Sequence, residues 1–209
     1  MKKGALEQKA HTDKQNIAGV DEVGRGCLAG PVYASTVVLN LAKLFDLDNK
    51  TILLIRDSKT LSSKQRSKML EVIHNISLSF AIGIASSLEI EQLGIVGATF
   101  LAMKRSLAQI SCEVHLLLVD GRATLPEYSG AQQALIKGDS LSFSIAAASI
   151  LAKEARDSFM REQSKEYQEY GFDEHVGYGT KKHLEAIHKY GICNLHRKNF
   201  APIKYLVDA

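Results

Sequence analysis

The pattern of hydrophobic and polar positions separates strand-like from helix-like stretches of the chain. Apolar and β-branched residues dominate from position 17, and the segments 17–21 (IAGVD), 31–39 (PVYASTVVL) and 79–86 (SFAIGIAS) are typical of strands. The short apolar run 114–120 (VHLLLVD) ends in a charge, as expected of a buried strand that reaches the edge of its sheet. The pattern therefore predicts a strand in each of these four segments.

Helical spacing predicts three longer helices. Apolar residues repeat at i, i+3 and i+4 over 142–168, which is the strongest helical pattern in the chain. A second helix is predicted over 63–75, with Ser62 or Ser63 as its N-terminal cap. A third is predicted over 88–110, although two glycines weaken its first half.

The order of these segments predicts an α/β chain in three parts. Residues 1–16 are polar and predict a solvated N-terminal arm without the apolar core of a signal peptide. Residues 17–176 mix strands and helices and are predicted to form one domain, which would be the catalytic one. Residues 177–209 carry two further helical patterns and are predicted to form a C-terminal helical segment. Because no stretch approaches 18 consecutive apolar residues, we expect no membrane span.

Composition and charge add little direction. Twenty-six Lys and Arg against 23 Asp and Glu give a net charge of +3, which allows a polyanionic partner without requiring one. The three cysteines (Cys27, Cys112 and Cys193) are widely spaced and lack any C-x-x-C pair. We therefore expect neither a disulfide framework nor a structural zinc site, and we expect a cytoplasmic location.

Acidic residues end or interrupt the apolar segments at three places. Asp21 and Glu22 follow IAGV, Asp120 ends VHLLLVD, and Asp157 lies in the strongest helix. Two carboxylates about 4 Å apart repel by roughly 4 kcal/mol at an effective dielectric of 20, so four together require a counter-cation such as Mg²⁺ or Mn²⁺. Each acid alone has a simpler explanation: a turn or cap after a strand, or for Asp157 an ion pair with Lys153. The acids indicate a metal site only as a set.

Glycines crowd the first acidic pair. Gly24, Gly26 and Gly30 form G-x-G-x-x-x-G, which is one residue too long for a dinucleotide-binding loop and precedes Pro31 and a strand instead of a helix. A glycine-rich turn beside metal ligands brings backbone N–H groups close to a phosphate or sugar. A simple β-turn explains the same glycines.

Other chemical candidates are weaker. Cys193-x-x-His196 has half of a zinc-site spacing, and Cys27 beside His175 or His183 could be a nucleophile, although a small buried cysteine is the better interpretation. A run of basic residues could form a strip that faces phosphates: Arg56, Lys59, Lys64, Arg66 and Lys68. A solvated helix face explains the last three equally well.

Seven motifs in order give the sequence a family resemblance from Ile17 to about Ile203. They are AGVDEVGRGCLAGPV, RDSKTLS, ATFLAMKR, LLLVDG, KGDSLSFSIAAASILAKEARDSFM, HVGYGTKKHL and GICNLHRKNFAP. Together they resemble type 2 ribonuclease H, specifically bacterial ribonuclease HII. The sequence departs from the family pattern at four positions that concern local helix geometry: Glu91, Gly94, Gln168 and Asn194.

The resemblance implies a fold and an activity. The fold is an RNase H-like mixed five-stranded sheet flanked by helices, with a C-terminal helical segment. The activity is endonucleolytic cleavage of RNA in RNA–DNA hybrids and 5′ of ribonucleotides embedded in duplex DNA, by two-metal catalysis with Mn²⁺ or Mg²⁺. The products carry 5′-phosphate and 3′-hydroxyl ends. The partners are these duplexes, and the enzyme is expected to be a monomer.

The resemblance also assigns residues. The metal ligands and catalytic residues are Asp21, Glu22, Asp120 and Asp157. The substrate-binding residues are Gly24, Arg25 and Gly26 for the ribose and scissile phosphate, Tyr178 for the RNA–DNA junction, and Ser58 with Lys59 for a phosphate. The sister type, ribonuclease HIII, has lysine in place of Arg25 and an extra N-terminal domain, so type HII is favoured. Two rival functions are a non-catalytic nucleic-acid-binding protein of the same fold and a metal-dependent phosphatase that acts on small molecules.

Overall fold

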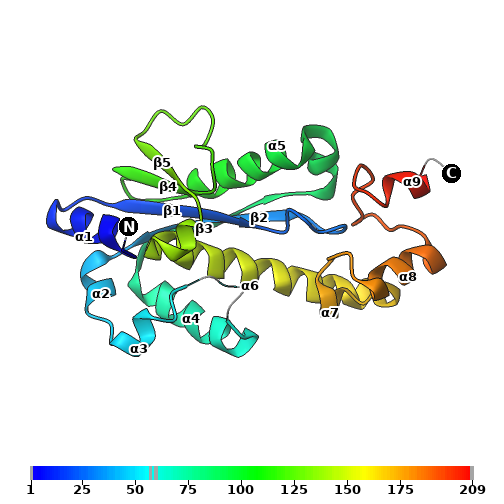
Figure 1. Cartoon of the computed structure of the whole chain (residues 1–209), viewed down its shortest axis with the longest axis horizontal. Helices are drawn as coiled ribbons and strands as arrows, with labels where there is room; N and C mark the ends of the chain where they lie inside the picture. The colour runs from blue at the N-terminus through cyan, green and yellow to red at the C-terminus, as the bar shows by residue number, and fades with distance from the viewer. Residues whose placement is uncertain (1, 57, 59–60, 208–209) are drawn as a thin grey trace.

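A mixed sheet carries the fold (Figure 1). The computed structural model describes residues 2–56, 58 and 61–207, and within them five strands lie in the order β3-β2-β1-β4-β5. The strand bounds are β1 Ile17–Val23, β2 Val32–Leu39, β3 Ser77–Ala85, β4 Leu116–Asp120 and β5 Gln132–Leu135. β1 pairs antiparallel with β2 and parallel with β4, so the mixed five-stranded sheet implied by the resemblance is confirmed.

Helices cover both faces of this sheet (Figure 1). α5 (Ser87–Leu107) packs against β2 and β3 on one face, and α6 (Phe143–Glu166) packs against β1 and β2 on the other, with α4 (Ser63–Ile76) beside it. The shorter helices are α1 Ala5–Thr12, α2 Leu41–Phe45, α3 Asn49–Ile52, η2 Gly138–Ser140, η3 Gln168–Tyr170, α7 Phe172–His175, α8 Lys181–Tyr190 and α9 Lys204–Val207. None of the helices in the described part of the chain is both long and apolar enough to span a membrane.

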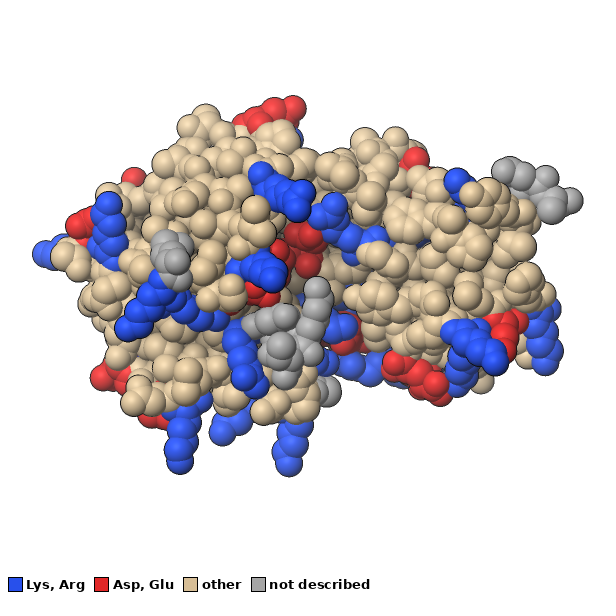
Figure 2. All heavy atoms as spheres, viewed as in Figure 1, with Lys and Arg blue, Asp and Glu red and all other residues tan. Residues whose placement is uncertain are grey.

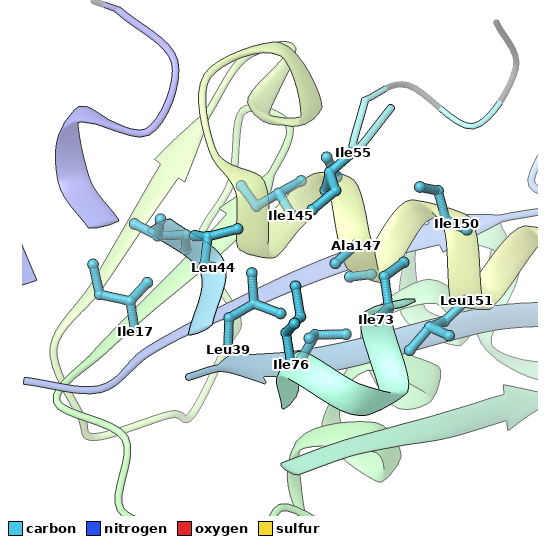
Figure 3. Packing of buried hydrophobic residues seen from close by; sticks show 14 of the residues in the cluster. Ile17, Leu39, Leu44, Ile55, Ile73, Ile76, Ile145, Ala147, Ile150 and Leu151 are labelled. Carbon is cyan, nitrogen blue, oxygen red and sulfur yellow. The ribbon is translucent and has the colours of Figure 1, made fainter. Parts of the chain in front are cut away.

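Apolar side chains fill the layers between the sheet and the helices. On the α6 face, Ile17 and Leu39 from the strands and Ile73 and Ile150 from the helices belong to one buried cluster that runs along the sheet (Figure 3). A second cluster lies between the sheet and α5, so all eight residues of β2 are buried. α6 approaches β1 closely at Gly19, where an added Cβ would lie 2.3 Å from the backbone nitrogen of the facing helix.

Side-chain caps fix the starts of the predicted helices. The Ser62 hydroxyl accepts the N–H of Gln65, whose side chain accepts the N–H of Ser62, and this capping box begins α4. The Ser142 hydroxyl accepts the N–H of Ile145, so α6 begins where the pattern predicted. The predicted weakness of α5 is a break at Gly94, whose φ of 69° is not helical.

The prediction of a solvated N-terminal arm is wrong for residues 5–12, which form α1. Glu7 is fully buried, and its Oε1 accepts hydrogen bonds from the Ser142 hydroxyl and the Ser144 N–H at the start of α6. A carboxylate suits the positive end of a helix dipole. Because a capping contact between distant segments leaves no hydrophobic signal, the polar sequence of the arm did not reveal this burial.

Candidate active site

Two neighbouring strands carry carboxylates at the same edge of the sheet. Asp21 and Glu22 lie near the end of β1, and Asp120 is the last residue of β4. The strands are parallel and pair Val20 with Val119, so Asp21 and Asp120 come next on strands that lie about 4.8 Å apart. Because side chains alternate along a strand, Asp21 turns toward α6 and Glu22 toward the α5 face.

Burial and like charges act together on Asp21. Burial raises the pKa of Asp21 well above its ordinary value, and the charges of Glu22 and Asp120 raise it further. Hydrogen bonds from the Ser149 hydroxyl and from the N–H of Glu22, at 2.7 Å from Oδ1, lower the pKa of Asp21 in part. The three carboxylates are therefore electrostatically coupled.

The other two carboxylates of this group have their own partners. Burial raises the pKa of Glu22, while Arg25, whose Nη1 lies 3.1 Å from Oε1, lowers it. Oδ1 of Asp120 accepts the backbone N–H of Gly138 at 2.6 Å. Arg25 thus offsets part of the negative charge at this edge of the sheet.

Asp157 is held by cations. Lys153 Nζ lies 2.8 Å from its Oδ1, which is the i,i+4 ion pair that the sequence allowed, and Arg66 Nη2 lies 3.4 Å from its Oδ2. Glu22 and Asp120 raise the pKa of Asp21, and Asp120 also raises that of Glu22, whereas the ion pairs of Asp157 are with these two basic residues. Over the described residues, no three His, Cys, Asp or Glu side chains converge closely enough to hold an ion as they stand.

The donor chemistry nevertheless fits a hard divalent cation. Carboxylate oxygens are the ligands that Mg²⁺ and Mn²⁺ prefer, and the repulsion that raises the pKa of Asp21 is what a bound cation would relieve. Arg25 and Lys153 now neutralise Glu22 and Asp157. An ion bound by all four acids would therefore share these carboxylates with Arg25 and Lys153.

The glycine-rich loop after β1 has two positions, Gly24 and Gly30, where a positive φ and close neighbours favour glycine. Gly24 has a φ of +92°, and a Cβ added there would lie 2.2 Å from Nε of Arg156. Gly26 has open space around the same position. The N–H of Cys27 reaches the carbonyl of Gly24 at 3.4 Å, so the loop also contains the simple turn that the sequence allowed.

Arg197, which sequence reasoning did not select, supports this loop from beneath. Its guanidinium is fully buried and donates to the carbonyls of Gly24 at 2.7 Å, Arg25 at 2.9 Å and Gly30 at 2.7 and 2.9 Å. Burial lowers the pKa of Arg197 to about 10, which leaves it charged at neutral pH. The only sequence signal was its place in the matched motif GICNLHRKNFAP.

Arg156 is a second buried arginine that sequence reasoning did not select. It directly precedes Asp157 in α6 and donates to the carbonyls of Ala29 and Pro31 at 3.0 Å and of Val176 at 2.8 Å. These bonds connect α6, the glycine-rich loop and the segment before Tyr178. The position of the loop therefore depends on two guanidinium groups that bind its backbone.

Tyr178 lies beside Asp157 and next to the glycine-rich loop. Its side chain is 37% exposed, Lys153 Nζ lies 5.9 Å from its ring centre, and its hydroxyl is hydrogen-bonded to Cys27. Its neighbour Gly177 has a φ of +87° and accepts the N–H of the loop residue Leu28 at 2.8 Å. Burial raises the pKa of Tyr178, so its hydroxyl stays protonated at neutral pH.

Two pockets border these residues. One of about 370 Å³ is lined by Glu22, Arg25 and Asp120 together with α5, and another of about 430 Å³ is lined by Asp157, Tyr178 and both basic and acidic neighbours. Figure 2 shows acidic side chains gathered in a hollow near the middle of the molecule, with lysines and arginines around it. This arrangement suits a ligand that is itself anionic and carries cations with it.

Ser58 and Lys59 differ in what the structure says of them. Ser58 is buried, and its hydroxyl lies 3.0 Å from the hydroxyl of Ser149, which bonds to Asp21. Lys59 lies outside the described residues. The side chain of Ser58 thus belongs to the network around Asp21.

The weaker candidates from the sequence have structural surroundings that explain them without a further site. Arg66 is mostly buried and paired with Glu154 and Asp157, so neither a solvated face nor a phosphate strip describes it. Cys27 is fully buried and burial raises its pKa, as expected of an unreactive thiol. Cys193 and His196, the pair with half of a zinc-site spacing, are joined by a hydrogen bond instead. The backbone N–H of Cys193 donates to Nδ1 of His196 at 2.8 Å.

Comparisons with known proteins match the sequence and the fold of this chain. The family model for ribonuclease HII matches residues 18–203. Ribonuclease HII of Clostridioides difficile is 50% identical over 184 residues, covering 88% of this chain and 69% of that protein. The crystal structure of ribonuclease H2 from Pyrococcus horikoshii superposes with a TM-score of 0.74 at 22% identity, covering 93% of this chain and 98% of that one. Bst-RNase HIII in complex with Mn²⁺ gives 0.70 at 19% identity, covering 93% and 70%.

The match to type HII over nearly the whole chain decides between the alternatives left open by the sequence. It favours an enzyme over a non-catalytic binder, and a nuclease over a phosphatase of small molecules. The chain belongs to the ribonuclease HII family, metal-dependent endonucleases that cleave RNA in RNA–DNA hybrids and ribonucleotides embedded in DNA.

Proposed function

We propose that Asp21, Glu22, Asp120 and Asp157 bind two Mn²⁺ or Mg²⁺ ions, and that the cut falls on the 5′ side of the ribonucleotide. The observation that carries this proposal is the electrostatic coupling at Asp21, whose pKa is raised by burial and by two further carboxylates. Four acids would only hinder a protein that binds phosphates without cations. The Mn²⁺ in the structure of Bst-RNase HIII supports the choice of metal.

The acids and their basic partners divide the work. Divalent ions held by these acids would supply the Lewis acidity for attack of water on the phosphodiester and for departure of the 3′ oxygen, and the expected products carry a 5′-phosphate and a 3′-hydroxyl. Lys153 and Arg66 keep the carboxylate of Asp157 fixed in its pocket. Arg25 presents a half-exposed guanidinium, and its planar fork suits a phosphate.

Ribose recognition is assigned to the loop and to Tyr178. A-form-like hybrids expose 2′-hydroxyls in a wide minor groove, where an aromatic ring and backbone groups detect them. The exposed part of Tyr178 would stack on a sugar. The loop that contains Gly24, Arg25 and Gly26 is bonded to the segment of Tyr178 through Leu28 and Gly177, which supports a joint role. The phosphate contact implied for Ser58 and Lys59 stays a prediction.

One assay tests this proposal. A DNA duplex with a single ribonucleotide and a matched all-DNA duplex are incubated with the enzyme and Mn²⁺, Mg²⁺ or a chelator, and the ends are mapped. We expect cleavage of the first duplex only, with the metal, leaving the ribonucleotide with a 5′-phosphate. Ends with a 2′,3′-cyclic phosphate would refute the mechanism. We also propose a monomer, and a cytoplasmic enzyme on the basis of its three free cysteines.

A further inference from the structure

Three buried histidines lie directly behind Tyr178. His175 ends α7, His183 lies in the first turn of α8, and His196 lies in the segment after α8. The rings of His175 and His183 stack at 4.4 Å between centroids, and those of His183 and His196 are 5.3 Å apart. Phe172, also fully buried, meets both stacked rings edge-on. The metal chemistry proposed above uses none of these side chains.

The hydrogen bonds of this cluster run in one direction. Nδ1 of His196 accepts the backbone N–H of Cys193 at 2.8 Å, so the proton of the neutral ring is on Nε2. That proton points to Nε2 of His183 at 3.1 Å, which must therefore accept. His183 then carries its proton on Nδ1 and donates to the carbonyl of Tyr178 at 2.9 Å. We call this series, from Cys193 through His196 and His183 to Tyr178, the histidine chain.

A second ring holds the adjacent peptide. Nδ1 of His175 accepts the N–H of Gly177 at 3.2 Å, and its Nε2 bonds to the carbonyl of Tyr170 at 2.8 Å, which fixes its tautomer as well. The N–H of Tyr178 donates to the carbonyl of His175 at 2.9 Å. The N–H of Gly177 and the carbonyl of Tyr178 are thus bonded to imidazole rings, and the N–H of Tyr178 is bonded to the backbone carbonyl of a histidine.

The histidine chain functions only while its rings are neutral, because each ring uses one nitrogen as an acceptor. Burial lowers the pKa of His183 and His196 to about 4, so both are neutral at neutral pH. A neutral, single-tautomer arrangement of this kind is rigid because each group has one available partner. A rigid backbone here fixes the position of the Tyr178 ring, which is partly exposed to solvent and so can contact a ligand.

We propose that His183 and His196 are positioning residues for ribose recognition, which set the place of the Tyr178 ring through its backbone carbonyl without contact to the substrate. This inference rests on the proposed role of Tyr178. Displacements of about 1 Å at a recognition group reduce rates by up to about a hundredfold, so a tenfold effect from loss of one link is expected. The inference gives a function to two buried histidines that the proposed metal chemistry does not use.

The test is a double-mutant cycle on a DNA duplex with one ribonucleotide. His183→Phe keeps a ring against Phe172 but has no donor, and we expect it to lower kcat/KM about tenfold. In the Tyr178→Ala background the same change should alter kcat/KM by less than twofold, because the residue it positions is gone. His183→Asn places an amide N–H near the former Nδ1 and should recover much of the loss. The control is His188→Phe on the exposed side of α8, with no effect expected.

Each outcome decides one question. An equal loss from His183→Phe in both backgrounds, or no loss in either, refutes the inference and leaves the role of Tyr178 intact. Full activity of Tyr178→Ala refutes the role of Tyr178 itself, and the inference with it. If His183→Phe does not fold, His196→Asn replaces it, because it keeps the acceptor for Cys193 and removes only the donor to His183. The same loss, absent in the Tyr178→Ala background, is expected.

Discussion

Replacing Gly24 by alanine tests whether the loop after β1 is held as tightly as its contacts indicate. Gly24 has a φ of +92°, and its added Cβ would lie 2.2 Å from Nε and 2.7 Å from Cδ of Arg156. Both atoms belong to a fully buried side chain whose Nε donates to Pro31 at 3.0 Å. Neither the backbone nor the guanidinium can keep its place.

The cost follows from these two conflicts. A non-glycine residue held at positive φ costs of order 1–3 kcal/mol. Moving Arg156 sacrifices a hydrogen bond from a charged donor, which is worth about 1.5–3 kcal/mol and more if the carbonyl stays buried and unpaired. We therefore expect Gly24→Ala to lower the free energy of unfolding by about 3–5 kcal/mol.

Gly26→Ala is the matched control in the same loop. Its added Cβ meets nothing within 4 Å, and its φ is not positive. Unfolding in urea, followed by circular dichroism, should place this variant within about 1 kcal/mol of the parent. If Gly24→Ala were equally stable, or if Gly26→Ala lost as much as Gly24→Ala, the contact between the loop and Arg156 could not be the cause.

Three further predictions follow from buried polar groups. Asp21→Asn should slow turnover a hundredfold or more, about 3 kcal/mol, yet raise stability because burial and repulsion penalise its charge; near-normal turnover would contradict the metal site. The pKa values of His183 and His196 are lowered from 6.5 to about 4. Their contribution to the free energy of unfolding, about 3 kcal/mol for one ring, is therefore complete above pH 6.5 and is lost as the pH falls through 4. NMR of the imidazole protons should show no titration between about pH 7 and 5. Ser58→Ala and Ser149→Ala should each cost about 1 kcal/mol in urea unfolding, with the double variant costing less than the sum; strict additivity would exclude their 3.0 Å bond.

Local rules predicted the parts of the fold that depend on local sequence. The helix predicted over 142–168 is α6, because its spacing and its cap at Ser142 both lie within the segment. The strand β5 could not be predicted, since QQAL has no apolar alternation and pairs with β4 through its backbone. Glycine gave a partial signal at Gly94, where the expected weakness is a break with positive φ.

Buried charge was the feature that sequence patterns missed. Hydropathy places Glu, Arg and Lys at the surface, and this is usually correct. Glu7, Arg66 and Arg197 are exceptions because their partners are carbonyls, N–H groups or acids from distant segments. The same limit applies at the site, where spacing located Asp157 but could not reveal that Arg66 joins Lys153 in holding it.

The two arginines beneath the loop also explain how an acidic site accepts a polyanion. Within the described residues neither Arg156 nor Arg197 forms an ion pair. Their two positive charges are buried against backbone carbonyls, and the guanidinium of Arg197 also lies 5.1 Å from the ring centre of Phe200. A buried charge without an acidic partner is costly, as the lowered pKa of Arg197 records. This arrangement turns the carbonyls of Gly24 and Gly30 inward to a guanidinium. They therefore point away from the surface, where they would repel a phosphate. The carboxylates that bind cations and the loop that meets the phosphate therefore lie side by side without opposing each other.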